Sequence, residues 1–170
     1  MILPATFGYV ALLVAYATWT DIRRRIIPNA IVLTLLGIFA LRWAVMPASV
    51  DIVPDLALAA AAFAFGYLSW HLRAVGAGDV KLISVLALWF GLAHAPLFLI
   101  VMALAGGAMS LSYIVVRSSP AAQYLISKVF PSIWELDWKS NAYTRTPYAV
   151  AICAGTFPAL FQQAAALGVI

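Results

Sequence analysis

Charged residues are scarce in this chain, and their scarcity is the first constraint on its fold and function. They make up 9% of the 170 residues, whereas 65% are hydrophobic. A soluble domain carries about 25% charged residues. The composition therefore predicts an integral membrane protein. At roughly 20 residues per span, there is room for about five to seven spans in a single domain, residues 1–170, and none for a separate soluble domain.

Cysteine and histidine are nearly absent as well. Cys153 is the only cysteine, which excludes a disulfide framework within the chain and any cysteine-based zinc site. The two histidines, His71 and His94, fall on opposite sides of the topology predicted below, so they cannot share a metal site. We expect no metal and no cofactor. The net charge of +4 does not indicate nucleic acid as a partner, because its distribution follows a membrane topology.

Apolar runs and helix breakers predict an all-α fold with six membrane-spanning helices. The approximate spans are 2–20, 30–45, 56–71, 80–92, 96–116 and 147–167. A less apolar, amphipathic segment at 121–139, broken near Pro131, is expected to lie at the membrane interface before the last span. No basic residue precedes the first apolar run, so we expect a retained span with its N-terminus outside, not a signal peptide.

The basic residues predict which loops face the cytoplasm. With the N-terminus outside, the cytoplasmic loops are 21–29, 72–79 and 117–146. Together with the adjacent Lys81, these loops hold nine of the ten lysines and arginines. This is a strong positive-inside pattern, and it predicts a multi-pass protein of the inner (cytoplasmic) membrane.

Two aspartates lie at the cytoplasmic edge of this predicted topology, in a chain that has only six acidic residues. Asp21 opens the run Asp-Ile-Arg-Arg-Arg-Ile-Ile-Pro-Asn, and Asp79 closes the run Gly-Ala-Gly-Asp. Ionisable groups at membrane depth are costly and suggest a functional site. Two carboxylates that can meet across helices are also sufficient for acid–base hydrolysis of a peptide bond.

The surroundings of the two aspartates predict different roles. Asp21 lies near a helix C-terminus, where the helix dipole and partial burial raise its pKa, and Arg25 lowers it. Asp79 lies at a helix start, which favours the charged form. We expect Asp79 to activate water as the base and a protonated Asp21 to polarise the scissile carbonyl. The structural alternatives are a salt bridge from Asp21 to Arg25, and Asp79 as the N-cap of the fourth span.

Five further residues are expected to bind substrate. Two glycines before Asp79 would let an extended peptide lie against the loop, and a lysine and a Pro-Asn pair lie nearby. These residues are Gly76, Gly78, Lys81, Pro28 and Asn29. In the alternative interpretation the glycines form a flexible turn, the proline starts the second helix and the asparagine caps it.

At these residues the chain resembles the type IV prepilin peptidases, which are membrane aspartyl proteases of the Gly-x-Gly-Asp class. The matching pieces are Asp21 with 26–29, the run Gly76-Ala77-Gly78-Asp79-Val80-Lys81-Leu82 and, more loosely, Thr146-Pro147-Tyr148-Ala149. The resemblance implies that Asp21 and Asp79 are the catalytic pair. It implies a prepilin substrate, whose short basic leader is cut on the cytoplasmic side just before its hydrophobic helix. The implied partners are the lipid bilayer and pilus assembly or secretion machinery.

One departure from the family pattern is informative. Longer members carry a loop with paired Cys-x-x-Cys motifs and also N-methylate the new N-terminus. This chain has no such pairs, so it resembles the short Flp/Tad-type form, and N-methyltransferase activity is not expected. Two alternatives stay open: an archaeal preflagellin or prepilin peptidase, and a non-enzymatic scaffold or transporter that uses the aspartates as a proton relay or in salt bridges.

Overall fold

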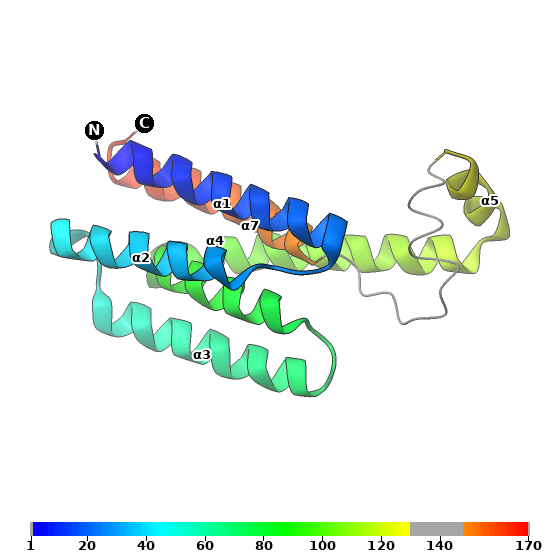
Figure 1. The fold of residues 1–170 in the computed structure, drawn as a ribbon, viewed down its shortest axis with the longest axis horizontal. Helices are drawn as coiled ribbons and strands as arrows, with labels where there is room; N and C mark the ends of the chain where they lie inside the picture. The colour runs from blue at the N-terminus through cyan, green and yellow to red at the C-terminus, as the bar shows by residue number, and fades with distance from the viewer. Residues whose placement is uncertain (1, 130–147, 170) are drawn as a thin grey trace.

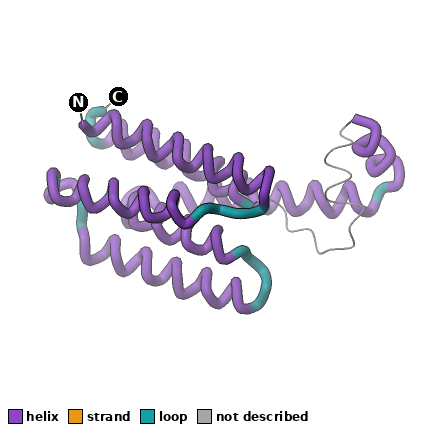
Figure 2. Tube along the Cα trace, in the orientation of Figure 1, coloured by secondary structure: helices purple, strands orange, loops and turns teal. Residues whose placement is uncertain are grey.

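Helices make up almost all of the described part of the chain, residues 2–129 and 148–169 of a computed structural model. The ribbon and tube views show a bundle of helices (Figure 1, Figure 2), and no strand occurs within these two ranges. The prediction of an all-α fold is therefore confirmed for the described residues.

The helices follow one another with short connections. In chain order they are α1 (Ile2–Arg24), α2 (Asn29–Val45), the 3-10 helix η1 (Pro47–Ser49), α3 (Ile52–His71), α4 (Ala77–Ser118), α5 (Pro120–Val129) and α7 (Ala149–Ala166). Helices α3, α4 and α7 are long and apolar enough to cross a membrane, and α2 is a shorter apolar helix. These helices support a membrane protein, whereas the count of six spans and the orientation of the N-terminus stay predictions.

The structure of α4 differs from the predicted start of the fifth span. The sequence suggested that one span ends near residue 92 and the next begins at Pro96. The break lies at Gly91, one residue before the predicted end of the fourth span, with a φ of 60° and a ψ of −176° that are not helical. That backbone conformation is essentially restricted to glycine. Pro96, the predicted start of the fifth span, lies inside the second limb of the same helix. Beyond the break the chain turns back on itself, so the two limbs of α4 run in opposite directions (Figure 1).

Two buried side chains of opposite charge, Asp55 and Arg42, lie close to this reversal. One carboxylate oxygen of Asp55, on α3, accepts a hydrogen bond of 3.1 Å from the backbone N–H of Leu92. The guanidinium of Arg42, on α2, lies 5.1 Å from the ring centroid of Trp89, and its charge attracts Asp55. Both charged side chains are buried. A backbone N–H freed by the break is thus satisfied by a side chain from a neighbouring helix.

Successive helices of the bundle run in alternating directions (Figure 1). The end of α1 and the starts of α2, α4 and α7 consequently lie at the same end of the bundle. Helices α1 and α7 contact each other and run antiparallel, with the two chain termini close together at the opposite end. The alternation therefore brings Asp21 and Asp79 to one end of the bundle, although they come from separate helices.

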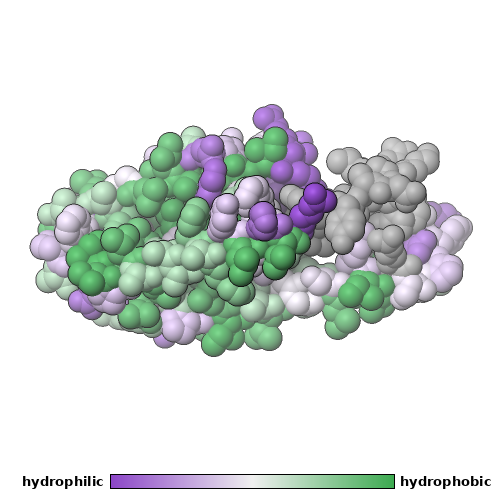
Figure 3. All heavy atoms as spheres, turned by 90° about the horizontal axis from the view of Figure 1, so that it is seen from below, coloured by the Kyte–Doolittle hydropathy of each residue, from purple (hydrophilic) through white to green (hydrophobic). Residues whose placement is uncertain are grey.

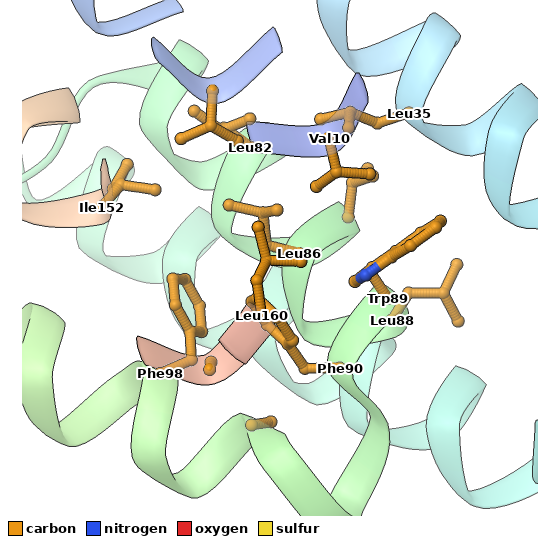
Figure 4. Close-up of a cluster of buried hydrophobic side chains, with 14 of the residues drawn as sticks. Val10, Leu35, Leu82, Leu86, Leu88, Trp89, Phe90, Phe98, Ile152 and Leu160 are labelled. Atoms are coloured by element: carbon orange, nitrogen blue, oxygen red, sulfur yellow. The ribbon is translucent and has the colours of Figure 1, made fainter. Parts of the chain in front are cut away.

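The core of the bundle contains large apolar side chains from α1, α2, α4 and α7 (Figure 4). Among the most buried are Val10, Leu35, Leu82, Leu86, Phe90, Phe98 and Ile152. Outward-facing side chains are also apolar over much of the face in Figure 3, and strongly hydrophilic ones gather near the middle of the view. An apolar exterior with a packed apolar interior suits helices that are surrounded by lipid.

Several predicted boundaries differ from the structure by one turn. Helix α1 continues beyond the predicted residue 20 to Arg24, and α3 begins at Ile52, not at residue 56. Helix α5 covers the first half of the predicted amphipathic segment. The second half, with Pro131, lies outside the described residues, as does Pro147 at the predicted start of the last span.

Candidate active site

A pocket of about 250 Å³ opens where the two aspartate motifs meet. Its walls come from the last turn of α1, the connection to α2, and the beginning of α4. The lining residues are Asp21, Arg25, Ile26, Ile27, Asn29, Gly76, Ala77, Gly78, Asp79 and Lys81. Both aspartates and four of the five residues predicted to bind substrate line this pocket, and Pro28 is not among the lining residues.

Asp21 is buried in the last turn of α1, with 8% of its surface exposed. Its Oδ2 accepts a hydrogen bond of 3.3 Å from the backbone N–H of Ala149, the first residue of α7. The C-terminus of its own helix disfavours a negative charge, but the N-terminus of α7 favours one. The carboxyl group therefore lies between two opposing helix ends, which the sequence alone did not indicate.

Burial is the largest influence on the acidity of Asp21, which lies just beyond the predicted first span. Burial raises the pKa of this carboxyl group above its ordinary value. The hydrogen bond from Ala149 and the charge of Arg25 lower the pKa and offset part of that effect. The direction agrees with the sequence-based expectation, and it favours a carboxyl group that holds a proton more readily than a free aspartate does.

The end of α1 is fixed by an unusual backbone conformation at Arg25. Its φ is 54°, in the left-handed region, and its N–H donates a hydrogen bond of 2.9 Å to the carbonyl oxygen of Asp21. This is the geometry of an αL helix terminus, in which glycine is the usual residue. Arg25 lines the pocket and acts on the buried Asp21 through its charge.

Asp79 is the third residue of α4, and Gly76 occupies the cap position without a side-chain cap hydrogen bond. The alternative of Asp79 as an N-cap is therefore wrong. A Cβ added to Gly76 would lie 2.7 Å from Oδ2 of Asp79, and one added to Gly78 would lie 3.1 Å from Cβ of Ile27. Neither glycine has a positive φ. The chain uses their small size, which lets the carboxylate and the α1–α2 connection come close to the start of α4.

Lys81 and Asn29 join the starts of two helices at the pocket. The Nζ of Lys81 donates a hydrogen bond of 3.0 Å to Oδ1 of Asn29. Pro28 occupies the cap position of α2, and Asn29 is the first helical residue, without a side-chain cap bond. The expectation that Asn29 caps the second helix is therefore wrong, because its side chain contacts α4 instead.

Three residues near the site had little or no signal in the sequence. Tyr148 was named only within the looser motif match at 146–149. It is half-buried beside Gly106 and interacts electrostatically with Asp79. Ala149 carries no polar side chain, so its backbone contact with Asp21 could not be predicted from residue type. The Oγ1 of Thr18 lies within hydrogen-bond distance of the carbonyl oxygens of Ala149, at 3.1 Å, and Val14, at 2.9 Å. Nothing in the sequence pattern singled out this threonine.

The arrangement can perform acid–base chemistry on a peptide bond. Two carboxyl groups from separate elements line one pocket, and burial gives one of them a raised pKa. Carboxyl groups in different surroundings can divide the roles of acid and base between them. Within residues 2–129 and 148–169, no group of three or more His, Cys, Asp or Glu side chains is placed to hold a metal ion.

Comparison with known proteins gives one match. The model of the type IV leader peptidase family matches residues 8–111, which is more than half of the chain. The matched region contains both aspartate motifs and the whole pocket lining, and it leaves out α7. No curated protein matches the chain, and no solved structure does.

Proposed function

The chain belongs to the type IV leader peptidase family, and we propose that it removes the short basic leader of Flp-like prepilins by aspartyl catalysis. The observation that carries the proposal is the pocket shared by Asp21 and Asp79. The family accounts for a leader peptidase-like aspartyl protease in a membrane. The Flp-like substrate, the cytoplasmic face and the roles of individual residues are the proposal's own additions.

In the proposed mechanism the two aspartates act on one water molecule and one carbonyl group. Asp79, as a carboxylate, accepts a proton from the water, whose oxygen attacks the scissile carbonyl carbon. Asp21, as a carboxylic acid, donates a hydrogen bond to the carbonyl oxygen as negative charge develops there. Proton transfer to the leaving nitrogen then breaks the C–N bond. Closely placed carboxyl groups titrate as a pair, so the two acidities belong to the dyad.

The pocket walls suit a peptide that enters from the end of the bundle. The backbone of 76–78 forms one wall, and the side chains of Ile26 and Ile27 form an apolar part of another. Arg25 and Lys81 add positive charge beside the aspartates. An acidic residue of the pilin helix is the expected contact of this positive charge, while the apolar pilin helix lies in the bilayer along the apolar faces of the bundle.

The proposed topology is a single domain of six spans in the inner membrane, with the N-terminus outside. Alternating helix directions and the reversal at Gly91 support six crossings, because each limb of α4 then crosses separately. The same alternation supports placing both motifs at one face. Pilus assembly or secretion machinery is the proposed setting of the reaction.

Co-expression with an Flp-type prepilin tests the function. The cleaved pilin is followed by gel shift and N-terminal sequencing, for the wild type and for Asp21→Asn and Asp79→Asn. We expect cleavage by the wild type and loss of cleavage in both variants, with normal amounts of protein in the membrane. Asp51→Asn is the matched control, since Asp51 is exposed and does not line this pocket. Equal processing by all variants, or none by the wild type with several pilins, favours the scaffold or transporter.

A further inference from the structure

The backbone of Ala149 is held by α1 at both of its polar groups. Its N–H donates to Oδ2 of Asp21 at 3.3 Å. Its carbonyl oxygen lies 3.1 Å from Oγ1 of Thr18, whose single hydroxyl proton is shared between this oxygen and the carbonyl oxygen of Val14 at 2.9 Å. Thr18 and Asp21 are three positions apart on α1, so they lie on one face of that helix. Ala149 itself is fully buried. A single residue at the start of α7 is therefore bonded on both sides by the last turns of α1.

Helix α7 is in turn held firmly against α4. A Cβ added to Gly155 would lie 2.5 Å from the carbonyl oxygen of Phe98 and 3.0 Å from the backbone nitrogen of Met102. The ring of Tyr148 lies against Gly106 in the same way. Such close contacts at small residues fix the relative position of helices within a membrane. The first turn of α7 is thus anchored independently of Asp21.

We propose that the first turn of α7 is a positioning element of the active site, in which the backbone of Ala149 fixes the carboxyl group of Asp21. The proposal rests on the proposed function, because it assigns Asp21 a catalytic role. It goes beyond the family match, which ends at residue 111 and does not include α7. Ala149 is a positioning residue here, since it acts on the reaction only through Asp21.

The contact with Ala149 also determines which oxygen of Asp21 carries the acid proton. An oxygen that accepts an N–H hydrogen bond in line with its lone pair is the carbonyl-type oxygen of a protonated carboxyl group. The N–H therefore keeps the proton off Oδ2, and the proton resides on Oδ1. A defined proton position lets Asp21 donate to the substrate without first reorienting, which is the benefit of a preorganised donor.

Proline substitution removes the N–H of Ala149 with a matched control. The first turn of a helix tolerates proline, because its N–H groups have no acceptor within the helix. Ala149→Pro deletes the donor to Asp21, whereas Val150→Pro places the same ring one position later and keeps it. We expect kcat/KM to fall about tenfold or more in Ala149→Pro relative to Val150→Pro, since a displacement of about 1 Å at a catalytic group can cost roughly 100-fold in rate.

The pH dependence of cleavage separates positioning from general damage. The N–H of Ala149 lowers the pKa of Asp21, so its loss raises that pKa. Asp21 acts as an acid, so its ionisation produces the alkaline limb of the pH–rate profile. We expect this limb to move to higher pH in Ala149→Pro and to stay in place in Val150→Pro.

The Thr18 hydroxyl provides a second test that does not alter α7. Thr18→Val keeps a similar shape but removes the hydroxyl, and with it the contacts of Oγ1 with the carbonyl oxygens of Ala149 and Val14. Thr18→Ser restores a hydroxyl that can make both contacts. We expect kcat to fall severalfold in the valine variant with little change in KM, and the serine variant to recover activity. If Ala149→Pro does not accumulate in the membrane, the positioning role is tested by comparing the kcat of Thr18→Val with that of Thr18→Ser.

The outcomes for the positioning element and for the function are distinguishable. The positioning role would be overturned if the two proline variants had the same kcat/KM and the same alkaline limb, and if Thr18→Val had the kcat of the wild type. The proposed function would stand in that case, because the wild type still cleaves. Absence of cleavage by the wild type would instead overturn the proposed function. A lower kcat/KM with a shifted limb in Ala149→Pro alone supports the positioning element.

Discussion

The Nζ of Lys81 lies 3.0 Å from Oδ1 of Asn29 and donates a hydrogen bond to it across 52 positions of the sequence. The bond joins the first turn of α4, which carries Asp79, to the first residue of α2. Both side chains are exposed, so the bond contributes little to stability. Its consequence is geometric, because it connects the two walls of the pocket that come from the two motifs.

Asn29→Ala and Lys81→Met test this connection through cleavage. We expect each variant to lower kcat/KM severalfold and to change the free energy of unfolding by under about 1 kcal/mol, since the bond is exposed. The double variant should lose less than the product of the two single effects, because both changes remove one shared interaction. Steady-state cleavage of a purified prepilin measures all four proteins. Multiplicative losses would show that the two side chains act separately.

Gly76→Ala is expected to disturb Asp79 selectively. The added Cβ would come within 2.7 Å of Oδ2, so the carboxylate must move, while the backbone φ of −75° accepts alanine without strain. A displacement of about 1 Å at a catalytic group can cost roughly 100-fold in rate, and we expect a loss of about tenfold or more in kcat with a thermal midpoint near that of the wild type.

Gly37→Ala is the control for that substitution. Gly37 lies within α2, and a Cβ there meets nothing within 4 Å. Alanine is favoured over glycine in a helix interior by about 0.5–1 kcal/mol, so this variant should retain cleavage and gain a little stability. Full activity in Gly76→Ala would contradict the close approach of Asp79 to the glycine.

Gly91→Ala is expected to destabilise the reversal in α4. The conformation of Gly91 costs a residue with a side chain about 1–3 kcal/mol, and the added Cβ would overlap the carboxylate of Asp55. Displacing Asp55 also weakens its bond to the N–H of Leu92, so the total loss should exceed about 2 kcal/mol. Thermal unfolding in detergent micelles measures the effect.

Gly168→Ala isolates the contribution of the backbone angle. Gly168 has a φ of 65°, close to that of Gly91, but a Cβ there meets nothing within 4 Å. It should therefore lose only the backbone strain of about 1–2 kcal/mol. Equal losses in the two alanine variants would mean that the contact with Asp55 adds nothing to the stability of the reversal.

Asp21→Asn should change stability in a pH-dependent way. Burial raises the pKa of Asp21 in the folded protein, so folding binds this proton more tightly than the unfolded chain does. That contribution to stability is complete below the unfolded pKa of about 3.9 and is lost as the pH rises through the folded pKa. The amide cannot ionise and keeps an acceptor for Ala149. Its thermal midpoint should therefore exceed that of the wild type near neutral pH, and the difference should shrink as the pH falls.

Asp21→Ala is the comparison for that experiment, because it removes both the charge and the acceptor. It should be less stable than Asp21→Asn at every pH, since the N–H of Ala149 loses its partner. Thermal scans from roughly pH 7 to about pH 4 cover the window. A difference between wild type and Asp21→Asn that does not change with pH would show that Asp21 titrates alike in the folded and unfolded states.

Several structural details were not readable from local patterns. The sequence predicted that the fourth span ends near residue 92 and that the fifth begins at Pro96, a residue type that interrupts helices. The break occurs at Gly91, where Asp55 from another helix satisfies the freed N–H. Likewise, Asp79 and Asn29 suit capping by residue type, but Gly76 and Pro28 take the cap positions. At Gly91 and at Asn29, a contact from another helix accompanies the departure from the local preference.

The sequence by itself determined the helical membrane class, the approximate helices and the two aspartate motifs, because hydrophobicity, charge and local spacing are properties of the chain. Only the tertiary structure decided that Asp21 meets the first amide of α7, and that Gly76 and Gly78 act through their small size. The physical reason is that these contacts join segments far apart in the chain. One of them uses the backbone of an alanine, whose side chain gives no sign of a polar role.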